Sequence, residues 1–175
     1  MWGDGCIVGS LRVAAFPLLG AAMLNGAPHG WGKTATGVPS LSAKLNRPTI
    51  LLADDHPGFP VIEEQVLKGE FDVIGMVCDG HALYEAAMRL KPDVIVTDIS
   101  MPVMSGIDAV DRLMHSGCTS KIVFLTVHTD DEFVRKCLST GALGYVVKPR
   151  MLADLILAIR EVLAGHIFVS ERLAD

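Results

Sequence analysis

The chain has 175 residues, half of them hydrophobic and a fifth charged, which is material for one sizeable soluble domain with an appendage. Its net charge of −5 gives no reason to expect nucleic acid as a direct partner. The cysteines show no paired spacing, which argues against a zinc site, a redox pair or a disulfide framework and suits a reducing cytoplasm. They are Cys6, Cys78, Cys118 and Cys137.

Residues 1–47 differ in character from the rest of the chain. Glycine and proline interrupt their apolar stretches, and no helical or strand period persists. The apolar stretch Val13–Leu24 follows no basic cluster, contains Pro17, and is shorter than the roughly 20 residues of a membrane-spanning helix. We therefore expect a poorly structured or misassigned extension over residues 1–47, a main domain over residues 48–170 and a C-terminal tail over residues 171–175, with no membrane contact.

From Thr49 onwards, short apolar runs alternate with amphipathic stretches. The runs are nearly continuous in Ile, Val and Leu, as expected of strands that are buried on both faces. They span Thr49–Ala53, Asp72–Val77, Val94–Thr97, Ile122–Thr126 and Leu143–Val147. Five such strands with helices between them predict a parallel sheet that is covered on both sides.

The stretches between the strands carry apolar residues at helical spacing. The first predicted helix, Val61–Leu67, is short and has Pro60 in its first turn. The later helices have clearer apolar faces. These faces consist of Leu83, Ala86, Ala87 and Leu90; Ile107, Val110 and Met114; Phe133, Val134, Cys137 and Leu138; and Leu152, Leu155, Ile156, Ile159 and Leu163.

Polar residues stand where four of the predicted strands end. They are Asp54 and Asp55 after the first strand, Asp98 after the third, Thr126 at the end of the fourth and Lys148 after the fifth. Ligands of open α/β sheets bind outside the carboxyl ends of the strands, so we expect these residues to converge on one rim. Each residue alone has an ordinary explanation as a cap, turn or strand residue, but their coincidence at one rim favours a functional site.

The chemistry of this rim suits phosphoryl transfer. Three close carboxylates repel one another, and Mg²⁺, a hard ion that takes oxygen ligands, would relieve the repulsion. A metal there would neutralise charge on an incoming phosphoryl group, while Lys148 would add a positive charge and Thr126 a hydrogen bond. A carboxylate nucleophile would yield an aspartyl phosphate, which is a known covalent role for aspartate.

Four segments together resemble the receiver domain of bacterial two-component response regulators. They are ILLADDHP, VIVTDISMPVMSG, IVFLTVH and GALGYVVKP. The resemblance covers about residues 48–170 and implies a doubly wound, flavodoxin-like five-stranded sheet in the order 2-1-3-4-5. LTVHTDDEFV and AIREVLAGHIFVS most resemble the subfamily that usually carries a LuxR-type helix-turn-helix output. The ten residues that follow Gly165 are too few for a helix-turn-helix, so we expect no direct nucleic-acid binding by this chain.

The resemblance implies a role for each acid at the rim. Asp98 would accept a phosphoryl group from the phosphohistidine of a sensor histidine kinase. Mg²⁺ would be held by Asp55, Asp98 and the main-chain carbonyl of Ser100, with Asp54 acting mainly through water. The implied function is cytoplasmic phosphorelay signalling, in which the protein catalyses only its own phosphorylation and dephosphorylation.

The resemblance also implies a switch. Thr126 and Lys148 would bind the phosphoryl group, and Tyr145 matches the family's aromatic residue that changes position on activation. Thr126 would move inward, Tyr145 would follow, and the surface of the fourth helix, fifth strand and fifth helix would then bind a partner or a second copy of the chain.

Some residues depart from the family pattern. Val127 is larger than the usual residue after the threonine and is expected to narrow access to Asp98. The sequence Gly58–Phe59–Pro60 is unusual at the start of the first helix, which is therefore expected to be short or tilted. His56 and His128 border the acidic residues, and we interpret them as packing or solvent-access residues rather than metal ligands.

Three alternatives stay open. The chain is the receiver fragment of a DNA-binding transcriptional regulator, or it is a phosphatase that forms an aspartyl phosphate. A haloacid dehalogenase-like phosphatase would want an acid two residues after the nucleophile, where this chain has Ser100. The third alternative, a binding module that no longer takes phosphate, is disfavoured by the intact set of Asp54, Asp55, Asp98, Thr126 and Lys148.

Overall fold

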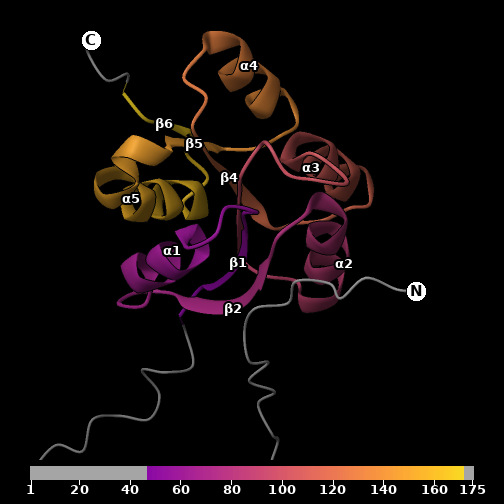
Figure 1. The fold of residues 1–175 in the computed structure, drawn as a ribbon, viewed down its shortest axis with the longest axis horizontal. Helices are drawn as coiled ribbons and strands as arrows, with labels where there is room; N and C mark the ends of the chain where they lie inside the picture. Colours follow the sequence, from indigo (N-terminus) through magenta and orange to yellow (C-terminus); the bar gives the residue numbers. More distant parts are fainter. Residues whose placement is uncertain (1–46, 172–175) are drawn as a thin grey trace, which may run out of the picture. The chain divides into compact units, whose positions relative to one another are not determined.

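The computed structural model describes residues 47–171 (Figure 1). The predicted extension over residues 1–47 and the predicted tail over residues 171–175 lie outside this part, apart from Arg47 and Glu171. The strands are β1 (Thr49–Ala53), β2 (Asp72–Val77), β3 (Val94–Thr97), β4 (Lys121–Thr126), β5 (Gly144–Val147) and β6 (Phe168–Val169). The helices are α1 (Phe59–Leu67), α2 (Gly80–Leu90), α3 (Gly106–His115), α4 (Asp131–Ser139), the short 3₁₀ helix η2 (Lys148–Arg150) and α5 (Met151–Leu163). Within residues 47–171, none of the helices combines the length and the apolar character needed to cross a membrane.

The strands form one parallel sheet in the order β2-β1-β3-β4-β5-β6. The predicted order 2-1-3-4-5 is confirmed, but the predicted number of strands was one too low. The additional strand is β6, in which Phe168 and Val169 pair with Gly144 and Tyr145 of β5. A strand of two residues has no readable alternation, so its apolar pattern could not be distinguished from that of a loop.

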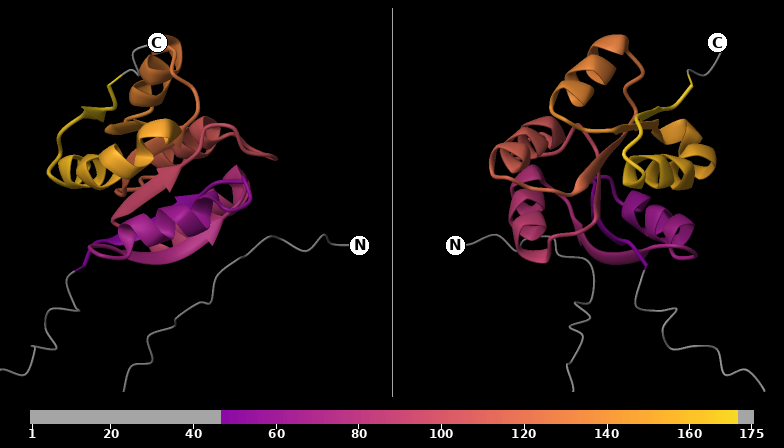
Figure 2. Two further views of the ribbon diagram at one scale, coloured as in Figure 1. Left: turned by 60° about the vertical axis from the view of Figure 1, so that its left-hand side comes forward. Right: turned by 180° about the vertical axis from the view of Figure 1, so that it is seen from behind.

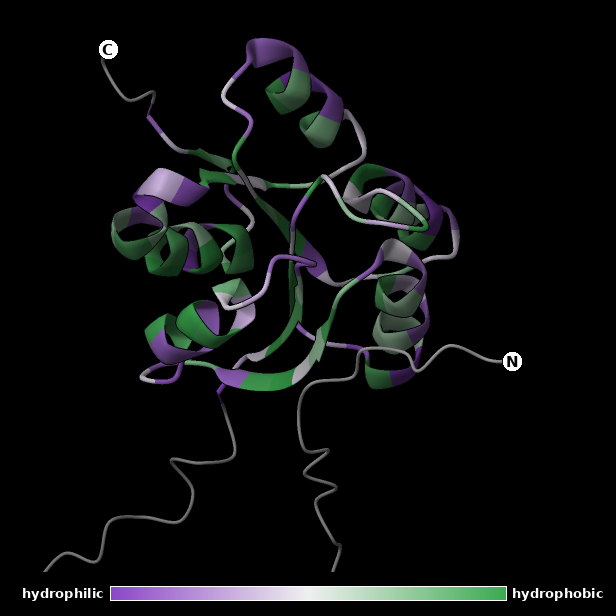
Figure 3. Cartoon of the chain, in the orientation of Figure 1, coloured by the Kyte–Doolittle hydropathy of each residue, from purple (hydrophilic) through white to green (hydrophobic). Residues whose placement is uncertain are grey.

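Helices cover both faces of the sheet, as the sequence predicted (Figures 1 and 2). Helices α1 and α5 lie on one face, and α2, α3 and α4 lie on the other. Alternate strand residues face opposite cores: Leu51 packs with residues of α2 and α3, whereas Ile50 and Leu52 pack with residues of α1 and α5. Figure 3 shows hydrophobic residues along the strands and both colours on the helices, which is the distribution expected of amphipathic helices on a buried sheet.

Two helices differ from the sequence prediction. The first helix begins at Phe59, two residues earlier than predicted, because Gly58 adopts a positive φ of 92° and Pro60 occupies the first helical turn. In α5 the buried stripe was placed partly wrongly, since Leu152 is 75% exposed. Its buried apolar residues are Met151, Leu155, Ala158, Ile159 and Val162.

The turn from β3 into α3 depends on a close backbone contact. Gly106 opens α3 where a Cβ atom would collide with the main-chain carbonyl oxygen of Asp98. The helix is capped by Ser105, whose side chain accepts a hydrogen bond from the amide of Asp108 at 3.2 Å. The glycine therefore allows the helix start to pack directly behind the loop that carries Asp98.

Candidate functional site

Three carboxylates meet at the carboxyl ends of β1 and β3. Asp54 and Asp98 are buried, with exposed fractions of 3% and 2%, while Asp55 is exposed. One ligand atom from each of these residues, together with one ring nitrogen of His56, lies within 4.8 Å of the others. The sequence predicted that these acids would converge, and the parallel sheet brings them together.

Lys148 places its ammonium group between two of the acids. Nζ lies 2.6 Å from Oδ2 of Asp54 and 2.6 Å from Oδ2 of Asp98, and the residue is only 6% exposed. Burial disfavours the charged ammonium, but its contacts with the two carboxylates outweigh this effect and raise the pKa of Lys148. Lys148 therefore stays protonated and partly neutralises the acidic cluster.

The main chain fixes the other oxygen of Asp98. Oδ1 accepts hydrogen bonds from the amide of Ile99 at 2.6 Å and from the amide of Ser100 at 3.4 Å. The carboxylate is therefore held by backbone amides on one side and by Lys148 on the other. This arrangement orients the group in a buried position where electrostatic interactions are strong.

His56 takes part in the cluster more directly than the sequence indicated. Its Nδ1 lies 3.1 Å from Oδ1 of Asp54, 3.1 Å from Oδ1 of Asp55 and 3.6 Å from Oδ2 of Asp98. The side chain is half exposed, so the ring stands between the carboxylates and solvent. The interpretation of His56 as a residue at the solvent boundary fits this position, and its contacts with all three acids were not foreseen.

The main chain of His128 joins Thr126 to Tyr145. Its amide donates a hydrogen bond to the hydroxyl oxygen of Thr126 at 3.3 Å, and its carbonyl accepts one from the hydroxyl of Tyr145 at 2.9 Å. The ring of His128 stacks on Phe133 of α4, with 4.1 Å between centroids, and its Nε2 lies 3.0 Å from Oγ of Ser100. One residue thus contacts the predicted phosphoryl-binding threonine, the predicted switch tyrosine and the loop after β3.

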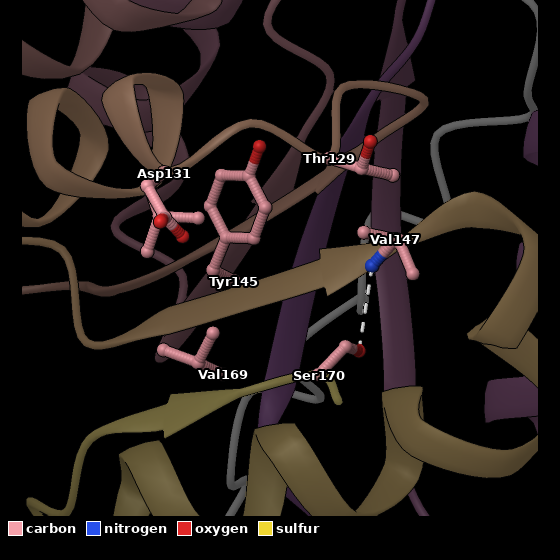
Figure 4. A pocket seen from close by; sticks show the side chains of 7 residues that line it. Thr129, Asp131, Tyr145, Val147, Val169 and Ser170 are labelled. Carbon is pink, nitrogen blue, oxygen red and sulfur yellow. Dashed lines mark hydrogen bonds between the residues drawn. The ribbon is translucent and has the colours of Figure 1, made fainter. Parts of the chain in front are cut away.

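Tyr145 lies beside a small pocket between α4, β5 and β6 (Figure 4). The pocket has a volume of about 70 Å³, and Tyr145 itself is only 1% exposed. The same pocket is lined by Val147 and Ser170, and the amide of Val147 donates a hydrogen bond to the hydroxyl oxygen of Ser170 at 3.4 Å. The segment after α5 therefore packs against the strand that carries the predicted switch residue.

A fourth acid near the site was missed by the sequence analysis. Glu63 of α1 is 1% exposed, and the pKa of its carboxyl is raised from 4.5 to about 8, first by burial and then by the negative charge of Asp54. Lys148 acts in the opposite direction, but its effect is smaller. The signal in the sequence was the spacing of Glu63 and Leu67, which places both residues on the same buried helix face.

The donor set fits a hard divalent cation. Asp54, Asp55 and Asp98 offer oxygen atoms close together, and one ammonium group cannot balance three carboxylates. A cavity of about 250 Å³ opens beside Asp54 and Asp55 and is walled on its other side by residues at the end of β2. The two acids are therefore approachable from this cavity, although Asp98 and Lys148 are covered.

These features define a class of protein: an α/β domain with an acidic pocket and a lysine at the carboxyl end of its parallel sheet, which is the end where ligands of such sheets bind. Comparison with known proteins agrees with that class. The chain belongs to the response regulator receiver domain family, which matches residues 50–160.

Curated relatives and solved structures agree with the family. The chain is 35% identical over 127 residues to the nitrate/nitrite response regulator protein NarL of Escherichia coli. The aligned stretch covers 71% of this chain and 59% of NarL. A two-component response regulator of the LuxR family from Aurantimonas sp. SI85-9A1 superposes with a TM-score of 0.68 at 28% identity, over 71% of this chain and 91% of that one. The non-phosphorylated receiver domain of the stress response regulator RcsB from Escherichia coli gives a TM-score of 0.67 at 26% identity, over 72% and 100% of the two chains.

Proposed function

We propose that this chain accepts a phosphoryl group on Asp98 from a sensor histidine kinase and thereby switches a binding surface. The observation that carries the proposal is the buried contact of 2.6 Å between Nζ of Lys148 and Oδ2 of Asp98, surrounded by further carboxylates. A lone buried ion pair would be a structural feature, whereas a lysine between two buried acids, with a third acid beside them at the end of a parallel sheet, suits an anionic group. Membership of the receiver family supports the same function.

The residues of the chain have distinct roles in the transfer. A carboxylate oxygen of Asp98 attacks phosphorus, the bond from phosphorus to the donor nitrogen breaks, and the donor imidazole leaves with the electron pair. Backbone amides hold Oδ1 of Asp98, so the nucleophile is oriented before the donor arrives. Lys148 then balances charge on the phosphoryl oxygens, and the hydroxyl of Thr126 donates a hydrogen bond to one of them.

Mg²⁺ is the cofactor we propose, held by Asp55, Asp98 and the main-chain carbonyl of Ser100, with Asp54 acting through water. When bound, it would neutralise negative charge that Lys148 alone leaves uncompensated. The protein would catalyse only its own phosphorylation and dephosphorylation and would not turn over an external substrate. The thiols of Cys118 and Cys137, neither of which is in a disulfide, suit the cytoplasmic location that we propose.

The link through His128 supports a route from the site to the surface. Thr126 would give up its hydrogen bond with the His128 amide to reach the phosphoryl group, and this shift would pull on the carbonyl that holds Tyr145. The surface of α4, β5 and α5 would change with it and bind a partner or a second copy of the chain. As an alternative, the chain is the receiver part of a DNA-binding regulator, since it spans about three fifths of the length of NarL.

The test of the site is the substitution Asp98→Asn. Incubation with acetyl phosphate and Mg²⁺ should add one phosphoryl group to the wild type, as seen by intact mass, and none to the variant. Asp111→Asn, an exposed acid on α3, is the matched control and should label like the wild type. Equal labelling of Asp98→Asn and the wild type would show that the acceptor is another residue.

A further inference from the structure

An aromatic ring covers the ammonium group of Lys148. Nζ lies 4.4 Å from the ring centroid of Phe59, at the start of α1, while its other contacts are the carboxylates of Asp54 and Asp98. A cation above a ring face is attracted electrostatically, and the attraction is stronger where water is excluded. The ring therefore completes the enclosure of the ammonium group.

The backbone holds Phe59 in this position. Gly58 has a φ of 92°, which turns the chain between β1 and α1, and Pro60 continues into the first turn of α1. The amide of Phe59 donates a hydrogen bond to the carbonyl of His56 at 3.3 Å, and the two rings meet edge to face with 6.2 Å between centroids. Phe59 and His56 thus form one cover: His56 lies over the acids and Phe59 over the lysine.

We propose that Phe59 is a positioning residue that sets the lifetime of the phosphoryl group on Asp98. This inference rests on the proposed function. In hydrolysis, a water oxygen attacks phosphorus, the bond from phosphorus to the Asp98 oxygen breaks, the carboxylate leaves with the electron pair, and the proton of water passes to solvent. Phe59 touches none of the reacting atoms, but it keeps water away from Lys148 and holds the ammonium group against Asp98.

The low exposure of the site supports this role. Asp98 is 2% exposed and Lys148 is 6% exposed, although both lie at the carboxyl end of the sheet. The neighbouring cavity reaches Asp54 and Asp55 but is not lined by Lys148. Ions can therefore approach the acids from the cavity while Phe59 shields the lysine.

The test compares Phe59→Ala and Phe59→Leu with a matched control. The control is Tyr84→Leu. It removes the ring of Tyr84 on α2, whose centroid lies 4.3 Å from Cζ of Arg112 on α3. Each protein is loaded with acetyl phosphate and Mg²⁺, the donor is removed, and loss of the phosphoryl group is followed by intact mass. In separate unphosphorylated samples, reductive methylation of Lys148 is followed by peptide mass spectrometry.

Phe59→Ala should raise both the hydrolysis rate and the methylation rate of Lys148 by about three- to tenfold, which lies within the range that the energy of a cation–π contact allows. Phe59→Leu keeps apolar bulk and should lie between alanine and the wild type, whereas Tyr84→Leu should match the wild type. Circular dichroism checks that each variant is folded. If Phe59→Ala is unfolded, the hydrolysis rate of Phe59→Leu tests the proposal. A hydrolysis rate within twofold of the wild type in folded Phe59 variants would overturn the proposal, whatever the methylation rate. Absence of label in the wild type would instead overturn the proposed function on which the lifetime depends.

Discussion

Among individual residues, Glu63 couples the site to pH. Its carboxyl is buried against Asp54, and its pKa of about 8 lies well above the ordinary value of 4.5. The folded protein keeps this proton at pH values where the unfolded chain has lost it. The stability that Glu63 contributes is therefore fully present below about pH 4.5 and is lost as pH rises through about 8.

The substitution Glu63→Gln should remove this dependence because glutamine does not titrate. Between pH 5 and 8 the free energy of unfolding of the wild type should fall relative to the variant by up to about 1.4 kcal/mol per pH unit. Urea denaturation at several pH values measures the difference. Glu85→Gln, on the exposed side of α2, should follow the wild-type curve. If the Glu63→Gln and wild-type curves ran parallel, Glu63 would not titrate in this range.

Single residues also show why the chemistry of the site was more predictable than its cover. Asp54, Asp98 and Lys148 each follow a recognisable strand, so the topology alone predicts that they meet. Phe59 was noticed only as an unusual residue at a helix start. Its contact with Lys148 depends on the left-handed turn at Gly58, and the pattern of apolar residues carries no information on that turn.

At the scale of elements, the start of α3 determines the position of Asp98. Gly106 packs against the main-chain carbonyl of Asp98, and its amide donates a hydrogen bond to the carbonyl of Ile99 at 2.8 Å. A side chain at position 106 would push the helix away from the loop that carries Asp98, the proposed acceptor. The position of the loop that carries Asp98 therefore depends on the position of the start of α3.

Gly106→Ala should lower the free energy of unfolding by about 1–3 kcal/mol, the usual cost of overpacking, because neither backbone segment can move freely. It should also slow phosphoryl uptake on Asp98, as followed by intact mass with acetyl phosphate. Gly69→Ala is the control, since nothing lies within 4 Å of the position of its Cβ, and it should change neither quantity. A Gly106→Ala variant as stable as the wild type would mean that the helix start can shift.

The elements that the sequence predicted best were the strands with nearly continuous apolar runs. The bounds of β1, β2 and β3 agree with the prediction to the residue, and β4 and β5 differ from it by one residue at their starts. The errors occur where tertiary contacts replace local pattern. The strand β6 forms by pairing with the edge of β5. Leu152 is exposed because the buried face of α5 contains Met151 and Leu155 instead.

At the scale of the whole domain, charge at the rim opposes folding. Asp54, Asp55 and Asp98 lie close together with Lys148 as their one buried cation among the described residues. A divalent ion that binds this cluster in the folded state should stabilise the domain by mass action, by about 2.7 kcal/mol at a concentration of 100 times its Kd.

Addition of Mg²⁺ should therefore raise the Tm of the wild type, and removal of the ion with EDTA should reverse the shift. Asp55→Asn should lose most of the shift because it removes a proposed metal ligand, and it should raise the Tm of the metal-free protein by relieving repulsion. Asp111→Asn should keep the full shift. Calorimetry measures all three proteins, and a shift of equal size in Asp55→Asn would place the metal elsewhere.

The parallel topology also has a consequence for how the protein is made. Asp98 and Lys148 are 50 positions apart in the sequence, and they meet only when β5 has docked beside β4. The ribosome synthesises β5 after β1 and β3. Parallel pairings of this kind close large loops and are intrinsically slow to fold. Until β5 has docked, Asp98 and the positively charged Lys148 are in separate parts of the chain. An incompletely synthesised or partly folded molecule therefore lacks the pairing of Asp98 with Lys148 on which the proposed phosphoryl transfer depends, and only the completed fold presents the proposed site.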